Sequence, residues 1–264
     1  MNNQIAQKIQ AAHLAMSIYP NVDEALACSR GQNPSLRFPL PTSGWLIGLN
    51  GAHLGEDMRL YPGTNSVGSS ARCNIVVTSP GTGRQHAVID VLSGESAMIY
   101  PGSTQRELYV NGEICTAPSL LTHGDTLQIG EQHFAYVSLL PNSESDKKSI
   151  TFLERFPTKY FCTAGWLVAL NGRNQGRDYR LFPGENRVGY QPGLEVVIFD
   201  QKINQRHAVI TRHAENWTIV PVTITEPILI NGVPSTGTAL QSGDILNFGQ
   251  NEFFFRTLKL VLCR

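Results

Sequence analysis

Short runs of β-branched, aliphatic and aromatic residues recur along most of the chain, separated by turn-forming residues at intervals of about 8–12 residues. In several runs the apolar positions alternate with polar ones, as in residues 107–111 and 207–212. This alternation is typical of strands that bury one face, and the spacing is typical of an antiparallel sandwich or barrel. The pattern predicts strands over residues 57–61, 74–78, 86–92, 97–100, 108–110, 126–129 and 134–139, and again over 178–182, 195–199, 207–212, 217–220, 228–230, 245–248 and 252–262.

Asn-Gly pairs interrupt this pattern at Asn50, Asn111, Asn171 and Asn231. Two-residue hairpin turns need positive φ at both central positions, which Asn and Gly tolerate better than other residues. We therefore expect a tight hairpin turn at each pair.

The chain contains an internal repeat. Residues 44–68 and 165–189 are identical at 15 of 25 positions, at an offset of 121. The same offset relates His86-Ala-Val-Ile to His207-Ala-Val-Ile. Two copies of one β domain, each of roughly 100 residues, therefore account for most of the chain.

Segments without the strand pattern divide the chain. Apolar residues between Ile5 and Tyr19 recur at three- and four-residue steps, which indicates one face of a helix. A Pro-rich connector follows, and a polar linker separates the two copies. We expect a helical N-terminal segment and its connector over residues 1–43, a first β domain over 44–140, a linker over 141–151 and a second β domain over 152–264.

Composition excludes several classes of function. Lys and Arg total 21, as do Asp and Glu, and affinity for nucleic acid rests on clustered basic residues. We therefore expect no nucleic-acid partner, and the absence of a run of about 18 apolar residues predicts no membrane span in this chain. Five widely spaced cysteines favour a reducing, cytoplasmic compartment. Because no metal-ligand spacing, nucleotide-binding motif or hydrolase motif occurs, we expect no metal, no cofactor and no enzymatic activity.

The order of landmarks in each copy resembles the forkhead-associated (FHA) domain. Leu-Asn-Gly is followed by Val-Gly before a loop, then His-Ala-Val-Ile, a second Asn-Gly and a Gly-Asp turn. The resemblance covers residues 44–140 and 165–258. It implies a mainly β protein of two antiparallel FHA-like β-sandwiches in tandem, each of eleven strands, behind the helical N-terminal segment. It also implies that loops at one end of each sandwich recognise phosphothreonine peptides through arginine and hydroxyl donors.

The positions that the resemblance assigns to phosphate are altered in both copies. The family's Gly-Arg is Gly68-Ser69 and Gly189-Tyr190, and its Ser-Arg-x-His is residues 83–86 and 204–207. The family's Asn-Gly-Thr has become residues 106–108 and 226–228, so that Glu226 replaces the asparagine in the second copy and would repel phosphate. The arginine, serine and asparagine that hold phosphate are thus missing.

The same loops still offer candidate peptide-binding or phosphate-binding residues. In the first domain these are Ser69, Ser70, Arg72, Arg84, Thr104 and Arg106, and in the second they are Tyr190, Asn204, Gln205, Arg206 and Thr225. Two arginines of the first domain reaching one phosphate would be chemically adequate. The alternative is that these arginines are solvated, with Arg106 paired to Glu107 or another carboxylate. We expect structural roles for His86, His207, Asn111 and Asn231.

These observations predict a non-enzymatic adaptor or scaffold that holds protein partners, phosphorylated or not, and that acts without a requirement for phosphate. The resemblance is compatible with a bacterial secretion or signalling assembly. The alternative function is a phosphothreonine-peptide reader acting through the first domain. The residues identify neither the partner nor the oligomeric state.

Overall fold

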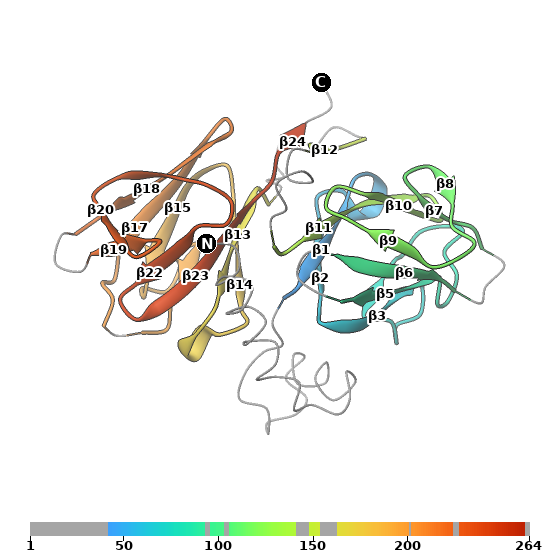
Figure 1. Ribbon diagram of the computed structural model, residues 1–264, viewed down its shortest axis with the longest axis horizontal. Helices are drawn as coiled ribbons and strands as arrows, with labels where there is room; N and C mark the ends of the chain where they lie inside the picture. Colours follow the sequence, from blue (N-terminus) through green and yellow to red (C-terminus); the bar gives the residue numbers. More distant parts are fainter. Residues whose placement is uncertain are drawn as a thin grey trace. The chain divides into compact units, whose positions relative to one another are not determined.

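The computed structural model describes residues 42–92, 96–102, 106–140, 148–153, 163–200, 202–223 and 227–261 (Figure 1). One compact unit contains the described residues of 42–153 together with 259–261, and the other contains those of 163–258. We call them the first and second sandwich. The mainly β fold predicted from the sequence is confirmed. The predicted N-terminal helical segment lies outside the described residues.

The first sandwich consists of a six-stranded and a five-stranded sheet. The larger sheet has the order β2 (Asp57–Leu60), β1 (Gly44–Gly48), β11 (Gln132–Ser138), β10 (Thr126–Ile129), β7 (Leu108–Val110) and β8 (Glu113–Ile114). The smaller sheet has the order β4 (Ile75–Val76), β3 (Gly63–Gly68), β5 (Ala87–Val91), β6 (Ala97–Pro101) and β9 (Ser119–Leu121). Neighbouring strands are antiparallel except for β3 and β4.

The second sandwich repeats this topology. Its larger sheet has the order β14 (Asp178–Leu181), β13 (Gly165–Ala169), β23 (Asn251–Thr257), β22 (Ile245–Phe248), β19 (Ile228–Ile230) and β20 (Val233–Ser235). Its smaller sheet has the order β16 (Val196–Val197), β15 (Gly184–Gly189), β17 (Ala208–His213), β18 (Asn216–Pro221) and β21 (Thr238–Leu240). The sequence repeat is therefore a repeat of strand order and pairing.

Strand alternation builds the core of each sandwich. In β5 and β17 every second residue is buried, including Ile89 and Ile210. The larger sheet of the second sandwich contributes aromatic rings instead, and Phe255 packs edge-on against Trp217 with ring centroids 5.4 Å apart. Edge-to-face pairs of this kind add to the stabilisation that burial alone provides.

A buried asparagine fastens the smaller sheet in each sandwich. The side chain of Asn65 accepts a hydrogen bond from the backbone N–H of Tyr61 at 2.9 Å and donates to carbonyl oxygens of Tyr61, Gly63 and Ile89. Asn186 makes the equivalent contacts in the second sandwich, and both side chains are fully buried. Both copies of the repeat contain the sequence Pro-Gly-x-Asn. Its buried asparagine is thus a brace that links β3 to β5 and β15 to β17.

The Asn-Gly pairs divide into two kinds, so the expectation of a hairpin turn at each was wrong for two of them. Asn111 and Asn231 have φ near +53° and +52° and close the hairpins β7–β8 and β19–β20. Asn50 and Asn171 have extended backbone and precede 3-10 turns, η1 (Gly51–His53) and η3 (Gly172–Asn174). Their side chains reach across the fold instead, because the Oδ1 atoms accept the backbone N–H groups of His133 and Glu252.

The end of the chain returns to the first sandwich. β24 (Leu260–Val261) pairs in parallel with β12 (Ile150–Thr151). The side chain of Phe152 is fully buried, and the backbone N–H of Leu153 donates to the carbonyl oxygen of Leu49. Residues on both sides of the second sandwich are thus part of the first unit.

Candidate functional site

Backbone hydrogen bonds join three loops at one end of the first sandwich. The β3–β4 loop meets the β4–β5 loop where the N–H groups of Ser69 and Ser70 donate to the carbonyl oxygens of Gly83 and Arg84, at 2.9 and 3.1 Å. Gly68 makes this approach possible, because a Cβ atom there would clash with the carbonyl group of Arg84. The candidate residues on these two loops are thus held side by side.

His86 joins the β4–β5 loop to the β6–β7 loop. Its Nδ1 atom accepts the backbone N–H of Gly83 at 3.0 Å, and its Nε2 atom lies 3.0 Å from the carbonyl oxygen of Glu107. Burial lowers the pKa of His86, the hydrogen bond to Glu107 opposes this change, and the nearby charge of Arg106 adds to it. A neutral imidazole that accepts at one nitrogen and donates at the other satisfies both contacts.

Three arginines on these loops have no side-chain partner among the described residues. Arg72, Arg84 and Arg106 are exposed, and none makes a side-chain hydrogen bond or ion pair within the part of the chain that the structure describes. The carboxylate of Glu107 accepts a hydrogen bond from the hydroxyl of Tyr109. Among the described residues no ion pair joins Arg106 to Glu107, which was part of the alternative interpretation. Thr104 lies outside the described residues.

The second sandwich holds its loops in the same way but uses its side chains differently. The backbone N–H groups of Tyr190 and Gln191 donate to the carbonyl oxygens of Asn204 and Gln205, both at 3.2 Å. The amide of Asn204 donates to the hydroxyl of Thr223 at 2.6 Å. This amide therefore fastens a loop to the neighbouring one. Gln205 and Arg206 are exposed, and Thr225 lies outside the described residues.

His207 takes the place of His86 in the second sandwich. Its Nδ1 atom accepts the backbone N–H of Asn204 at 3.4 Å, and its ring packs edge-on against Phe248 with centroids 5.7 Å apart. In both sandwiches the histidine at the start of the His-Ala-Val-Ile run is therefore bound to its own loop.

Asn111 and Asn231 link two turns in each sandwich. Asn111 donates to the Oδ1 atom of Asp125 at 3.2 Å, and Asn231 donates to that of Asp244 at 2.9 Å. Burial alone would raise the pKa of Asp125, but hydrogen bonds from Thr122, Lys148 and Asn111 lower it overall. The second Asn-Gly pair and the Gly-Asp turn are thus one structural unit.

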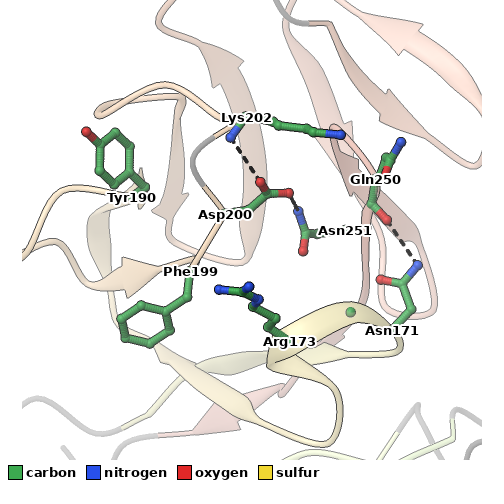
Figure 2. Close-up of a pocket in the computed structure, with 9 residues that line it drawn as sticks. Asn171, Arg173, Tyr190, Phe199, Asp200, Lys202, Gln250 and Asn251 are labelled. Atoms are coloured by element: carbon green, nitrogen blue, oxygen red, sulfur yellow. Dashed lines mark hydrogen bonds between the residues drawn. The ribbon is translucent and has the colours of Figure 1, made fainter.

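An open pocket of about 860 Å³ lies on the second sandwich (Figure 2). It is lined by residues of four loops: Asn171, Gly172 and Arg173 of the η3 turn, Tyr190 of the β15–β16 loop, Phe199, Asp200 and Lys202 of the β16–β17 loop, and Gln250 and Asn251 at the β22–β23 turn. The pocket brings two cationic side chains and two aromatic rings to one place.

Among the residues of this pocket, sequence reasoning named only Tyr190 as a candidate binding residue. The signal that could have found the others is the repeat itself. At the shared offset, Ala52 stands where the second copy has Arg173, and Thr78 stands where it has Phe199. The pocket is marked by positions at which the two copies differ.

The described residues show two further absences. No helical segment among them has the length and hydropathy of a transmembrane span. Nor do the described ranges contain a group of three or more His, Cys, Asp or Glu side chains arranged to hold a metal ion.

Two family models match the chain. The FHA domain model matches residues 65–130, and the model for the cytoplasmic domain of the inner membrane component of the type III secretion system matches residues 169–259. The oxoglutarate dehydrogenase inhibitors of Corynebacterium jeikeium and Corynebacterium diphtheriae are 25% identical over 89 residues and 27% identical over 92 residues. These stretches are 34% and 35% of this chain and 62% and 64% of the relatives, so the chain spans less than two thirds of the length of the curated relatives it matches.

Solved structures similar to part of this chain include an FHA domain from Chlamydia trachomatis, 27% identical, with a TM-score of 0.34 over 37% of this chain and 98% of that one. The cytoplasmic domain of the type III secretion sorting-platform protein PscD from P. aeruginosa is 20% identical, with a TM-score of 0.34 over 38% of this chain and 85% of that one. Sequence landmarks, strand order and family matches agree. The chain therefore carries two FHA-like sandwiches in tandem, in which the positions expected to hold phosphothreonine are largely substituted.

Proposed function

We propose that the chain is a non-enzymatic adaptor that holds protein partners at the loop ends of its FHA-like sandwiches and does not require their phosphorylation. The observation that carries this proposal is that the contacts between the loops are present while the residues expected to bind phosphate are replaced. His86 still joins two loops, and Gly68 still permits their close approach, yet Ser69 stands where the resemblance implies an arginine. A serine supplies one neutral donor instead of a charged fork, so phosphate loses its strongest partner.

The second sandwich supports the same proposal. Tyr190 occupies the arginine position, and the amide of Asn204 is already bonded to Thr223. Releasing that amide to a ligand would break an existing hydrogen bond, which reduces the net gain from binding.

The family matches support a setting for this adaptor. The model that matches residues 169–259 describes a cytoplasmic domain of a secretion component, and the curated relatives are inhibitors of an enzyme. Both descriptions favour action on other proteins. We propose a cytoplasmic location beside a membrane-bound assembly.

A second function is favoured by one observation. Arg72, Arg84 and Arg106 are exposed on joined loops of the first sandwich and have no side-chain partners among the described residues. Cations in this position could bind a phosphothreonine, so the first sandwich is also a candidate phosphopeptide reader.

Titration of the full chain with a degenerate phosphothreonine peptide library and its unphosphorylated counterpart separates the two functions. The adaptor proposal expects no preference for the phosphorylated library. A photo-crosslinking residue placed at Ser69 or at Tyr190 should also capture the same partner from cells before and after phosphatase treatment. Micromolar binding of the phosphorylated library, abolished by Arg84→Ala with Arg106→Ala, would establish the reader instead.

A further inference from the structure

We propose that the pocket between Arg173 and Lys202 binds an acidic, unphosphorylated peptide segment of a protein partner. An acidic side chain of the peptide would contact Arg173 or Lys202, and an adjacent apolar side chain would contact Phe199 and Tyr190. This inference rests on the proposed adaptor function and assigns it a site. The η3 turn and the β22–β23 turn supply part of that site, and neither contains a candidate residue from the phosphate-binding pattern.

The cations of the pocket are available to a ligand. Arg173 and Lys202 come from different loops, and both are exposed. Neither side chain makes a hydrogen bond or ion pair with another described residue. Cationic side chains that line one concave surface attract anions more strongly than scattered ones, because the protein excludes part of the screening solvent.

Asp200 lies in the same pocket but is held by the fold. Its Oδ1 atom accepts the backbone N–H of Lys202 at 2.9 Å, and its Oδ2 atom accepts the side-chain amide of Asn251 at 2.7 Å. The backbone hydrogen bond from Lys202 lowers the pKa of Asp200, burial opposes this, and the Asn251 contact lowers it further, as do the nearby charges of Lys202 and Arg173. This carboxylate therefore stays ionised and orders the β16–β17 loop.

The fixed charge of Asp200 discriminates between anions. A phosphate group carries a charge of about −1.5 to −2 at neutral pH, whereas a carboxylate carries −1. Together with Arg173 and Lys202, Asp200 leaves the pocket a net charge of about +1. One carboxylate balances this charge, whereas a phosphate group would leave an excess of negative charge. The pocket accordingly fits the side chain of Asp or Glu in a peptide.

Exposed aromatic rings flank the charged part of the pocket. Figure 2 shows Tyr190 and Phe199 on one side and Asn171 and Gln250 on the other. The side chain of Phe199 is 56% exposed and that of Tyr190 is 38% exposed. The guanidinium of Arg177 lies 5.3 Å from the centroid of the Phe199 ring, which orders that ring without covering both of its faces. Exposed, ordered aromatic rings next to arginine are the composition of protein-binding surfaces.

The first sandwich provides an internal comparison. Thr78 and Phe199 both donate their backbone N–H to the last residue of the neighbouring 3-10 turn, so the two frameworks agree. The side chains differ: the first sandwich has Ala52, Ser69, Thr78, Gly81 and Glu131 where the second has Arg173, Tyr190, Phe199, Lys202 and Gln250. Ser79 and Glu131 stand where the second copy has Asp200 and Gln250, so the number of acidic residues does not change. Within one framework, cations and aromatic rings coincide at a pocket of the second copy.

The test uses the full chain and an array of short peptides with a central Asp or Glu flanked by Leu, Ile or Phe. Matched peptides carry Asn or Gln at the centre, and a third series carries phosphothreonine. We expect binding to the acidic series only. In solution, Arg173→Ala with Lys202→Ala should weaken the best acidic peptide at least tenfold, or about 1.4 kcal/mol. Lys259→Ala, an exposed cation outside both the pocket and the candidate loops, is the control and should leave the affinity unchanged.

Three other outcomes would contradict the proposed site. The acidic peptides could bind no more tightly than the Asn and Gln peptides, the phosphothreonine peptides could bind more tightly than the acidic ones, or the double variant could keep the affinity of the wild type. Thermal unfolding verifies that the variants fold, and Arg173→Gln with Lys202→Gln replaces the alanine pair if that pair is unstable. Failure of the pocket proposal would not contradict the adaptor proposal, because crosslinking at Ser69 tests the adaptor proposal on the other sandwich.

Discussion

The Nε2 atom of His86 lies 3.0 Å from the carbonyl oxygen of Glu107, and through this contact one imidazole spans two loops of the first sandwich. The other ring nitrogen accepts the backbone N–H of Gly83. A second proton on the ring would place two N–H groups against each other at Gly83. The neutral form of His86 therefore holds two loops together, which is a structural role rather than the role of a catalytic base.

Stability should depend on pH through His86. Its pKa is lowered in the folded state, chiefly by burial, so at pH values just below the ordinary histidine pKa of about 6.5 the unfolded state binds more protons than the folded state. The contribution of His86 is therefore complete above this pH and declines as the pH falls towards the folded-state pKa. We expect His86→Gln to cost about 1–2 kcal/mol at pH 7.5, from the loss of one or both loop contacts.

Denaturant unfolding of the wild type and His86→Gln at several pH values between 7.5 and 5 measures this effect. Because the other histidines are present in both proteins, the difference between the two curves isolates His86. That difference should narrow as the pH falls. A constant difference would show that the pKa of His86 is the same in both states.

The buried asparagines should be sensitive to truncation. Asn65→Ala removes a side chain that satisfies backbone groups of Tyr61, Gly63 and Ile89. Backbone groups left without partners in the interior cost about 1–3 kcal/mol each, so we expect a loss of at least about 2 kcal/mol in the free energy of unfolding. Asn186→Ala should do the same in the second sandwich, and Asn216→Ala, an exposed position in β18, serves as the control. A loss under about 0.5 kcal/mol in either buried variant would contradict the brace.

The strand pattern predicted most of the fold because these strands bury alternate residues, as β5 and β17 do. The prediction left out β1 and β13, because they are buried at every position and show no alternation. It also left out β3 and β15, which begin and end with glycine, and the short edge strands β8, β9, β20 and β21. Asn50 and Asn171 misled the turn prediction because Asn-Gly is compatible with more than one turn, and the choice depends on a distant backbone N–H at His133 or Glu252. Such long-range partners leave no local signal.

The candidate site was predictable only in part. The loops that hold Ser69, Arg84 and His86 could be placed because glycines and the histidine mark their framework. The pocket at Arg173 and Lys202 could not, because its lining comes from loops that are far apart in the sequence and that carry no motif. Local sequence shows which residues are polar, but it does not show which of them the fold brings together.

The second sandwich should fold without the segments that precede and follow it. Its compact unit runs from residue 161 to residue 258, whereas β12, Phe152 and β24 are packed in the first unit. We propose that residues 161–258 expressed alone give a cooperative thermal transition and a β-type circular dichroism spectrum. Residues 152–264 should melt at the same temperature, because the added ends have lost their partners. A molten product from 161–258 would show that the two units depend on each other for folding.

Restoring one donor should restore phosphate recognition in the first sandwich. The backbone of Ser69 is fixed by its hydrogen bond to Gly83, so an arginine at this position would project from a defined point beside the loop of Arg84. A charge-assisted contact contributes about 1.5–3 kcal/mol, which corresponds to a gain of at least tenfold in affinity. We expect Ser69→Arg to bind a phosphothreonine peptide library at least tenfold more tightly than the wild type does, with no gain for unphosphorylated peptides. Ser69→Gln matches the bulk without the charge and should show no gain. Equal binding by the arginine and glutamine variants would mean that the missing charge at position 69 is not what separates this sandwich from a phosphopeptide reader.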